Sequence, residues 1–145
     1  MSRTPLYLLL NQLLGIVGKS FPQYLRYSRP YIPPGREGIW DTIEAIVHDQ
    51  DVLAERISQL LLDAEAPLRP GEFPMEYTDT HDLSIDYQLK EAIAYQQQDI
   101  ESIRALIDSL QSYPEAKALA EEALGMAKGH LESLQEMVPA GTAAS

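Results

Sequence analysis

The chain has 145 residues, 45% of them hydrophobic, which fits one globular domain better than a disordered acidic segment or a membrane bundle. Its 22 Asp and Glu against 11 Lys and Arg give a net charge of −11, so we expect no binding to nucleic acid or to an anionic membrane surface. The absence of cysteine excludes disulfides, thiol catalysis and cysteine-based metal sites, and it favours a cytoplasmic protein.

The first predicted helix begins after Thr4 and ends before Pro30, because apolar residues recur there at steps of three and four. Thr4 is the predicted N-cap, with Pro5 at the first helical position. Pro22 lies inside the pattern and predicts a kink, since its ring clashes with the carbonyl group four residues earlier. Polar residues interrupt the apolar run and no cleavage-site pattern follows it, so we interpret the segment as a helix and not as a secretion signal.

The second predicted helix covers residues 39–63 and follows a loop rich in Pro and Gly. The next segment, residues 64–83, contains three prolines and one glycine and cannot form a regular helix. It is long for a connection, and its apolar residues indicate that it packs on the helices. We therefore expect a crossover that spans the length of the domain.

The third predicted helix covers residues 85–110, and the fourth begins at Ser112. Ser112 and Glu115 have the spacing of a capping box, in which each side chain accepts a backbone N–H group of the other residue. We expect a single domain over residues 1–138 and a flexible tail over residues 139–145.

No segment alternates with period two, so the predicted fold class is all-α. Four helices of similar length with short, long and short connections predict a four-helix bundle with up-down-down-up topology. Its single long crossover lies between the second and third helices. This is the ferritin-like arrangement.

Short sequence segments also resemble the ferritin family, and bacterioferritins in particular. The segments Leu10–Gly15 and Phe21–Leu25 resemble the first bacterioferritin helix in residue order and spacing. Ala54–Ile57 is similar to the end of the second helix. Gly129–Leu131, followed by Leu134, is similar to the segment that carries the metal-binding histidine of the fourth helix.

The resemblance implies inward-facing Glu residues on the first and third helices and a Glu-x-x-His motif on the second and fourth, which together hold two iron ions. Transferred to this sequence, the ligand positions fall on Val17, Ile46, Asp49, Gln96, Ala127 and His130. Only His130 matches the family pattern. Shifting the second helix by one residue brings His48 to a ligand position, but Ala45 then occupies the glutamate position. We therefore expect no di-iron centre and no cofactor.

Two interpretations of these positions remain open. In the first, His130, Gln96 and Gln50 form a neutral hydrogen-bonded cluster with Tyr24 or Asp49. In the second, a single iron or other divalent ion binds His130 and Asp49, or a rearranged site that uses Glu44 or His48. Glu44 and His48 recur with other charged residues opposite the apolar stripe of their helix, which favours a solvated charged face.

The second predicted helix also carries a strip of Val47, Ala54 and Leu61 beside its core stripe. Aromatic residues cluster around the turn between the first two helices. We expect an isologous homodimer through these two helices. The alternative is that the strip widens the buried face of the helix.

These features favour a dimeric binding or interaction protein built on a ferritin-like bundle, with no catalytic residue. Two alternatives are an iron-binding or iron-oxidising protein with a rearranged site, and a small-ligand binder that uses the interior or the tyrosine-rich end.

Overall fold

The structure is a computed structural model that describes residues 5–80 and 83–139. Within these ranges all regular structure is helical, which confirms the predicted all-α class. None of the helices there has the length and apolarity needed to cross a lipid bilayer. The elements are α1 (Leu6–Gly18), α2 (Phe21–Ser28), α3 (Glu37–Asp63), the 3-10 helix η1 (Met75–Thr80), α4 (Ile85–Ser109) and α5 (Pro114–Glu136).

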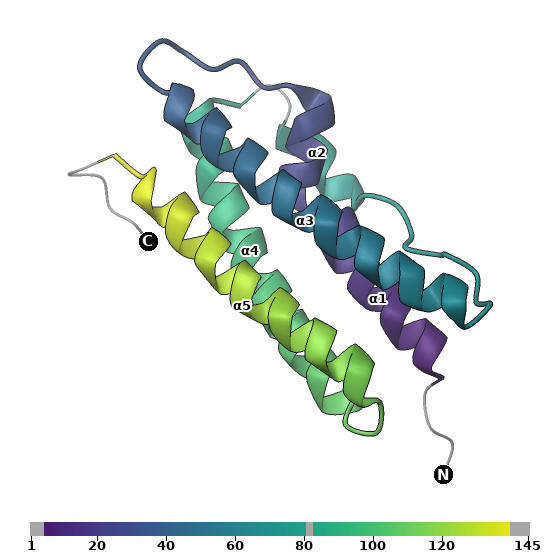
Figure 1. The fold of residues 1–145 in the computed structure, drawn as a ribbon. Coiled ribbons are helices and arrows are strands. Elements are labelled where there is room, and N and C mark those ends of the chain that lie inside the picture. The colour runs from purple at the N-terminus through teal and green to yellow at the C-terminus, as the bar shows by residue number, and fades with distance from the viewer. Residues whose placement is uncertain (1–4, 81–82, 140–145) are drawn as a thin grey trace.

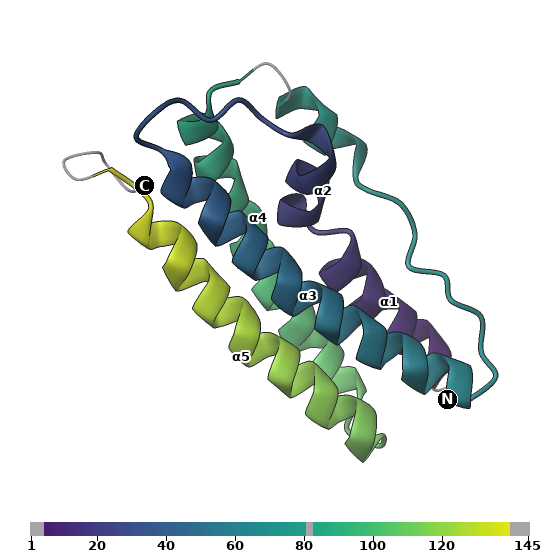
Figure 2. The same ribbon diagram turned by 45° about the horizontal axis from the view of Figure 1, so that its top comes forward.

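The helices pack lengthwise in two neighbouring pairs (Figures 1 and 2). In one pair α1 and α2 follow each other along α3, and in the other α4 packs against α5. The pairs meet through contacts of α3 with α5 and of α1 and α2 with α4. Helices α3 and α4 run in the same direction, and the segment between them returns along the outside of α1 (Figure 2).

The first predicted helix is in fact two helices, and the prediction of one helix kinked at Pro22 is wrong. Helix α1 ends at Gly18, and Ser20 is the N-cap of α2, where its hydroxyl oxygen accepts the N–H group of Gln23. Pro22 therefore lies in the first turn of α2, where its missing N–H group removes no hydrogen bond. At the other end of α1, Pro5 is the N-cap and not the first helical residue; Thr4 lies outside the described residues.

The predicted capping box at Ser112 and Glu115 does not form. Helix α5 begins at Pro114 with Tyr113 as its N-cap, and no side chain caps it. Proline at the first helical position is favoured because that residue needs no N–H group, so the helix begins later than the box requires. At its other end α5 stops at Glu136, and the predicted flexible tail lies outside the described residues from residue 140 on.

The crossover between α3 and α4 is fastened to α1 by Asn11 and Gly15. The Asn11 amide donates to the Pro67 carbonyl oxygen at 3.0 Å and accepts the N–H group of Arg69 at 2.6 Å. A Cβ atom on Gly15 would lie 2.5 Å from the Pro70 carbonyl oxygen, so only glycine allows this approach. The predicted packing of the crossover on the helices is present here.

The strip of α3 predicted as a dimer face is instead part of the core. Val47 is 4% exposed and Leu61 is 0% exposed within the single chain, and Ala54 packs partly buried against the core. The physical reason is that α3 contacts α1, α2 and α5, so a wide face of this helix is covered. The alternative interpretation of a wider core stripe is confirmed for these residues.

The buried apolar side chains form two clusters along the helices. The first cluster lies toward the start of α1 and includes Leu13, Leu53, Ile103 and Ala120. The second cluster lies toward α2 and includes Phe21, Ile43, Leu89 and Leu134.

Candidate functional site

A layer of buried polar side chains lies where the two apolar clusters meet. Four parts of the chain contribute one residue each. These residues are Ser20, which precedes α2, Gln50 on α3, Gln96 on α4 and His130 on α5. We call these four residues the polar layer. Buried polar groups need hydrogen-bond partners, so the contacts of each residue show what the layer can do.

His130 pairs with Asp49 across the contact between α5 and α3. Its Nε2 atom lies 2.8 Å from Asp49 Oδ2. The Asp49 side chain is 44% exposed while the His130 side chain is 10% exposed, so the pair connects the interior with solvent. Of the two partners predicted for the cluster, Asp49 is the one that contacts His130.

Gln96 binds the main chain of α5 and not the imidazole of His130. Its Nε2 atom donates to the Ala127 carbonyl oxygen at 3.1 Å. Its Oε1 atom is buried and has no hydrogen-bond partner among the described residues. An unpaired buried acceptor costs about 1–3 kcal/mol, so this oxygen marks a place where a donor is missing.

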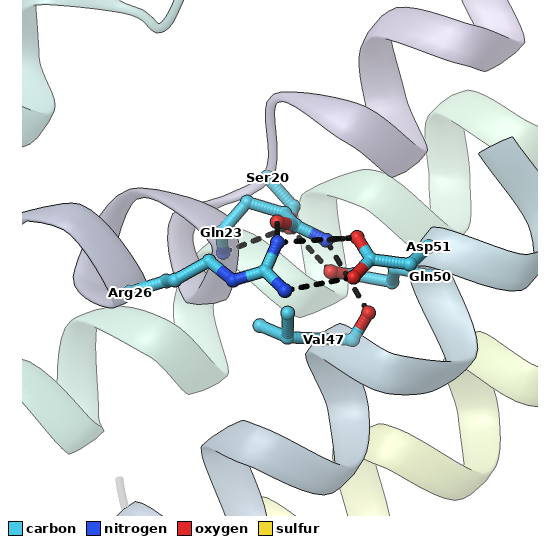
Figure 3. A network of polar contacts seen from close by, with 6 residues as sticks. All are labelled: Ser20, Gln23, Arg26, Val47, Gln50 and Asp51. Atoms are coloured by element: carbon cyan, nitrogen blue, oxygen red, sulfur yellow. Dashed lines mark hydrogen bonds and ion pairs between the residues drawn. The ribbon is translucent and has the colours of Figure 1, made fainter.

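Gln50 belongs to a network that joins the start of α2 to the middle of α3 (Figure 3). The Ser20 hydroxyl donates to Gln50 Oε1 at 2.9 Å. Beside it, Gln23 Nε2 donates to Asp51 Oδ1 at 3.1 Å, and Arg26 forms an ion pair with Asp51 at 2.8 Å (Figure 3). Side-chain contacts to α3 therefore fix the position of the chain where α1 ends and α2 begins.

A small cavity of about 20 Å³ lies between the residues of the polar layer and the first cluster. Its wall is formed by Ile16, Val17, Gln50, Leu53, Gln96, Asp99, Ile103, Ala123, Met126, Ala127 and His130. Four of the six positions that the resemblance assigned to metal ligands, Val17, Gln96, Ala127 and His130, thus meet at one place.

The other two predicted positions, Ile46 and Asp49, are not part of this wall. Helix α3 contributes Gln50 and Leu53 instead, which have the same spacing of three residues. Ile46 belongs to the second cluster, and Asp49 contacts His130 from outside the cavity. The sequence alignment of this helix rested on a short motif, and a shift of one turn keeps the same helix face.

Asp99 is a member of the site that the sequence analysis missed. It lines the cavity one turn after Gln96, and burial raises the pKa of its carboxyl group from an ordinary 3.8 to about 7. A sequence signal was present, because Asp99 falls on the steps of four and three that join buried residues of α4. The buried residues of this series are Ala92, Gln96, Ile103 and Leu106, and Asp99 lies partly buried between Gln96 and Ile103.

Glu44 and His48 do not join His130. Both are exposed, as are Asp51 and Glu55, so the interpretation as a solvated charged face is confirmed. Glu44 and His48 line an open groove between α2 and α3 together with Arg26 and other residues. Within residues 5–80 and 83–139 no three His, Asp or Glu side chains are placed to hold a metal ion.

The donor set at the cavity does not fit two iron ions. It offers one imidazole, one carboxyl group and two amides, whereas a di-iron centre needs several carboxylates to balance its charge. The arrangement can accept and donate hydrogen bonds and can bind a proton at Asp99. Comparison with known proteins adds no assignment, because no family model, curated protein or solved structure matches this chain.

Proposed function

We propose that the chain is a ferritin-like four-helix bundle without a di-iron centre, and that it acts as a dimeric binding or interaction protein. Its support is the same direction of α3 and α4 with a long segment between them (Figure 1), together with the short sequence resemblances in α1, α2, α3 and α5. The proposal assigns no catalytic residue and no metal.

The observation that carries the proposal is the composition of the cavity wall. If α3 is shifted by one turn from the first alignment, the proposed equivalents of the ferritin ligand positions all line the cavity. They are Val17, Gln50, Leu53, Ala127, His130 and either Gln96 or Asp99. Val17, Leu53 and Ala127 offer no metal ligand there. The imidazole of His130 and the single carboxyl group of Asp99 are too few to hold the two iron ions of a ferroxidase site.

A redesign of the cavity tests both the ancestry and the alignment of α3. Five substitutions would rebuild, together with native His130, a set of four carboxylates and two imidazoles. They are Val17→Glu, Gln50→Glu, Leu53→His, Gln96→Glu and Ala127→Glu. We expect the melting temperature to fall in chelator, because buried carboxylates repel one another, and to rise with Mn²⁺ or Fe²⁺, which bind only the folded state.

The matched control uses the alternative alignment, with Ile46→Glu and Asp49→His replacing the two α3 substitutions. Because neither residue lines the cavity, this variant should respond less to metal. If both redesigned variants fold but the melting temperature of neither changes with metal, the resemblance to ferritins is limited to the order of the helices.

The dimer in this proposal uses the outer faces of α1 and α3. With Val47 and Leu61 buried, the exposed apolar side chains on these helices include Leu8, Val52 and Leu62. Light scattering after size exclusion should report a dimer for the natural chain and a monomer of unchanged helicity for Leu62→Asp. The control Met75→Asp, on an 86% exposed residue of η1, should stay dimeric. A monomeric natural chain would contradict this part of the proposal.

We do not extend the proposal to the two alternatives. Of the candidates for a rearranged iron site, Glu44 and His48 lie in the α2–α3 groove and away from the cavity wall. The remaining pair, His130 and Asp49, offers one imidazole and one carboxylate. An organic ligand in the interior would need several hundred Å³, and the interior cavity has about 20 Å³, so the small-ligand alternative is limited to the surface of the chain.

A further inference from the structure

We propose that the cavity beside Gln96 is a binding site for one small hydrogen-bond donor, a water molecule or an ammonium ion, held by acceptor atoms of α4. This inference goes beyond the proposed function, because it concerns what the interior binds and not what it has lost. It stands on the contacts of one amide, the chemistry of the wall and the size of the cavity.

The orientation of the Gln96 amide is set by the main chain of α5. A carbonyl oxygen only accepts hydrogen bonds, so the NH₂ group of Gln96 must face the Ala127 carbonyl, 3.1 Å away. Oε1 then has to point elsewhere, and it has no partner among the described residues although Gln96 is only 2% exposed. Since Gln96 lines the cavity, the missing donor belongs there.

Asp99 supplies a second acceptor on the same wall, one turn further along α4. Two titratable groups from neighbouring elements face Asp99: His130 of α5 lines the same cavity, and Tyr77 of η1 interacts with Asp99 electrostatically. Asp49 of α3 is paired with His130. Burial and the charge of Asp99 raise the pKa of Tyr77. No Lys or Arg lines the cavity, so a donor inside it meets no competing cation.

The size and composition of the wall limit the occupant to one small molecule. A cavity of about 20 Å³ has room for about one water. Apart from Gln50, Gln96, Asp99 and His130 the wall is apolar, and the Gln50 oxygen already accepts the Ser20 hydroxyl. A hard metal cation needs about six oxygen ligands, which this wall does not provide.

A high-resolution crystal structure of the natural chain tests the proposal. We expect one electron-density peak at hydrogen-bond distance from Gln96 Oε1. The peak should be lost in Gln96→Leu, and in Gln96→Met, which keeps the length of the side chain should the first variant fail to fold. The matched control Gln98→Leu, on the exposed side of the same helix, should keep it.

Melting curves in ammonium chloride and in potassium chloride distinguish the two occupants. Ammonium predicts a higher melting temperature in ammonium chloride for the natural chain and no difference for Gln96→Leu or Asp99→Asn. Water predicts equal melting temperatures in both salts, with the peak present in each. An empty cavity in the natural chain, a peak that persists in both Gln96 variants, or a peak with the anomalous signal of a metal would overturn the proposal.

Discussion

His130 Nε2 and Asp49 Oδ2 lie 2.8 Å apart, and their contact joins the middle of α5 to the middle of α3. The two partners differ in exposure, since 44% of the Asp49 side chain but only 10% of the His130 side chain is accessible to solvent. Removing one partner therefore has different consequences from removing the other. Water can replace the imidazole at Asp49, whereas little water reaches the imidazole of His130.

We predict that Asp49→Leu destabilises the chain more than His130→Leu. The first change leaves a buried imidazole without its partner and should cost about 1–3 kcal/mol, and the second should cost less than about 1 kcal/mol. Urea unfolding monitored by circular dichroism gives both values. The double variant should cost less than the sum of the single ones; additive losses would show that the contact contributes nothing.

A second prediction concerns the pH dependence of stability through Asp99. Its carboxyl group binds a proton more tightly in the folded chain, where its pKa is about 7, than in the unfolded chain, where the ordinary value is 3.8. Unfolding then releases this proton between these two pH values, so the contribution of Asp99 to stability is full below pH 3.8 and is lost as pH rises through about 7. The loss is on the order of 2–4 kcal/mol.

Asp99→Asn should remove this decline, because asparagine stays neutral at all these pH values. The variant should match the natural chain below pH 3.8, and its advantage in stability should grow as pH rises and be complete at pH 8. Asp108→Asn, on an exposed residue of the same helix, should keep the decline. Identical pH profiles for the natural chain and Asp99→Asn would show that Asp99 is not a buried acid.

The missed role of Asp99 shows what the sequence could and could not predict. The periods of α3, α4 and α5 predicted that these helices exist, yet the charged residue type gave no indication that Asp99 is partly buried and lines the cavity. Ser20 before Pro22 is a helix-start signal, but the spacing of Val17 and Phe21 continues across the break and suggested one helix.

Other features had no sequence signal at all. Gln96 donates to the main-chain carbonyl oxygen of Ala127. Because every residue has this carbonyl group, the sequence does not indicate which one Gln96 binds. The strip of Val47 and Leu61 had the same pattern for a core as for an interface, because both bury apolar side chains. The packing of α1, α2 and α5 around α3 shows that the strip belongs to the core.

Val47→Asp should therefore destabilise the fold itself and not merely separate subunits. A charge at a site that is 4% exposed has no partner and should cost about 3 kcal/mol or more. Thermal unfolding monitored by circular dichroism should show a much lower melting temperature. Ala45→Asp, on an exposed residue of the same helix, should change stability by about 1 kcal/mol or less. Equal effects of the two changes would place Val47 on the surface.

Two glycines of α1 form a matched pair for a test of the crossover. Gly15→Ala places a Cβ atom 2.5 Å from the Pro70 carbonyl oxygen and should cost about 1–3 kcal/mol, because backbone has to move. Gly18→Ala meets no atom within 4 Å and should gain up to about 1 kcal/mol from helix propensity. Chemical denaturation compares them directly. If Gly15→Ala is as stable as Gly18→Ala, the crossover is not held against α1 at this point.

The iron stoichiometry of the natural chain, prepared without an affinity tag and measured together with its ferrous oxidation rate, tests the central claim most directly. Because Val17, Leu53 and Ala127 supply no ligand, we expect less than about one iron per chain and oxidation at the rate of buffer alone. His130→Leu should give the same values, since any iron held by exposed carboxylates does not need the imidazole. Two iron ions per chain, with oxidation faster than buffer that His130→Leu abolishes, would contradict the account.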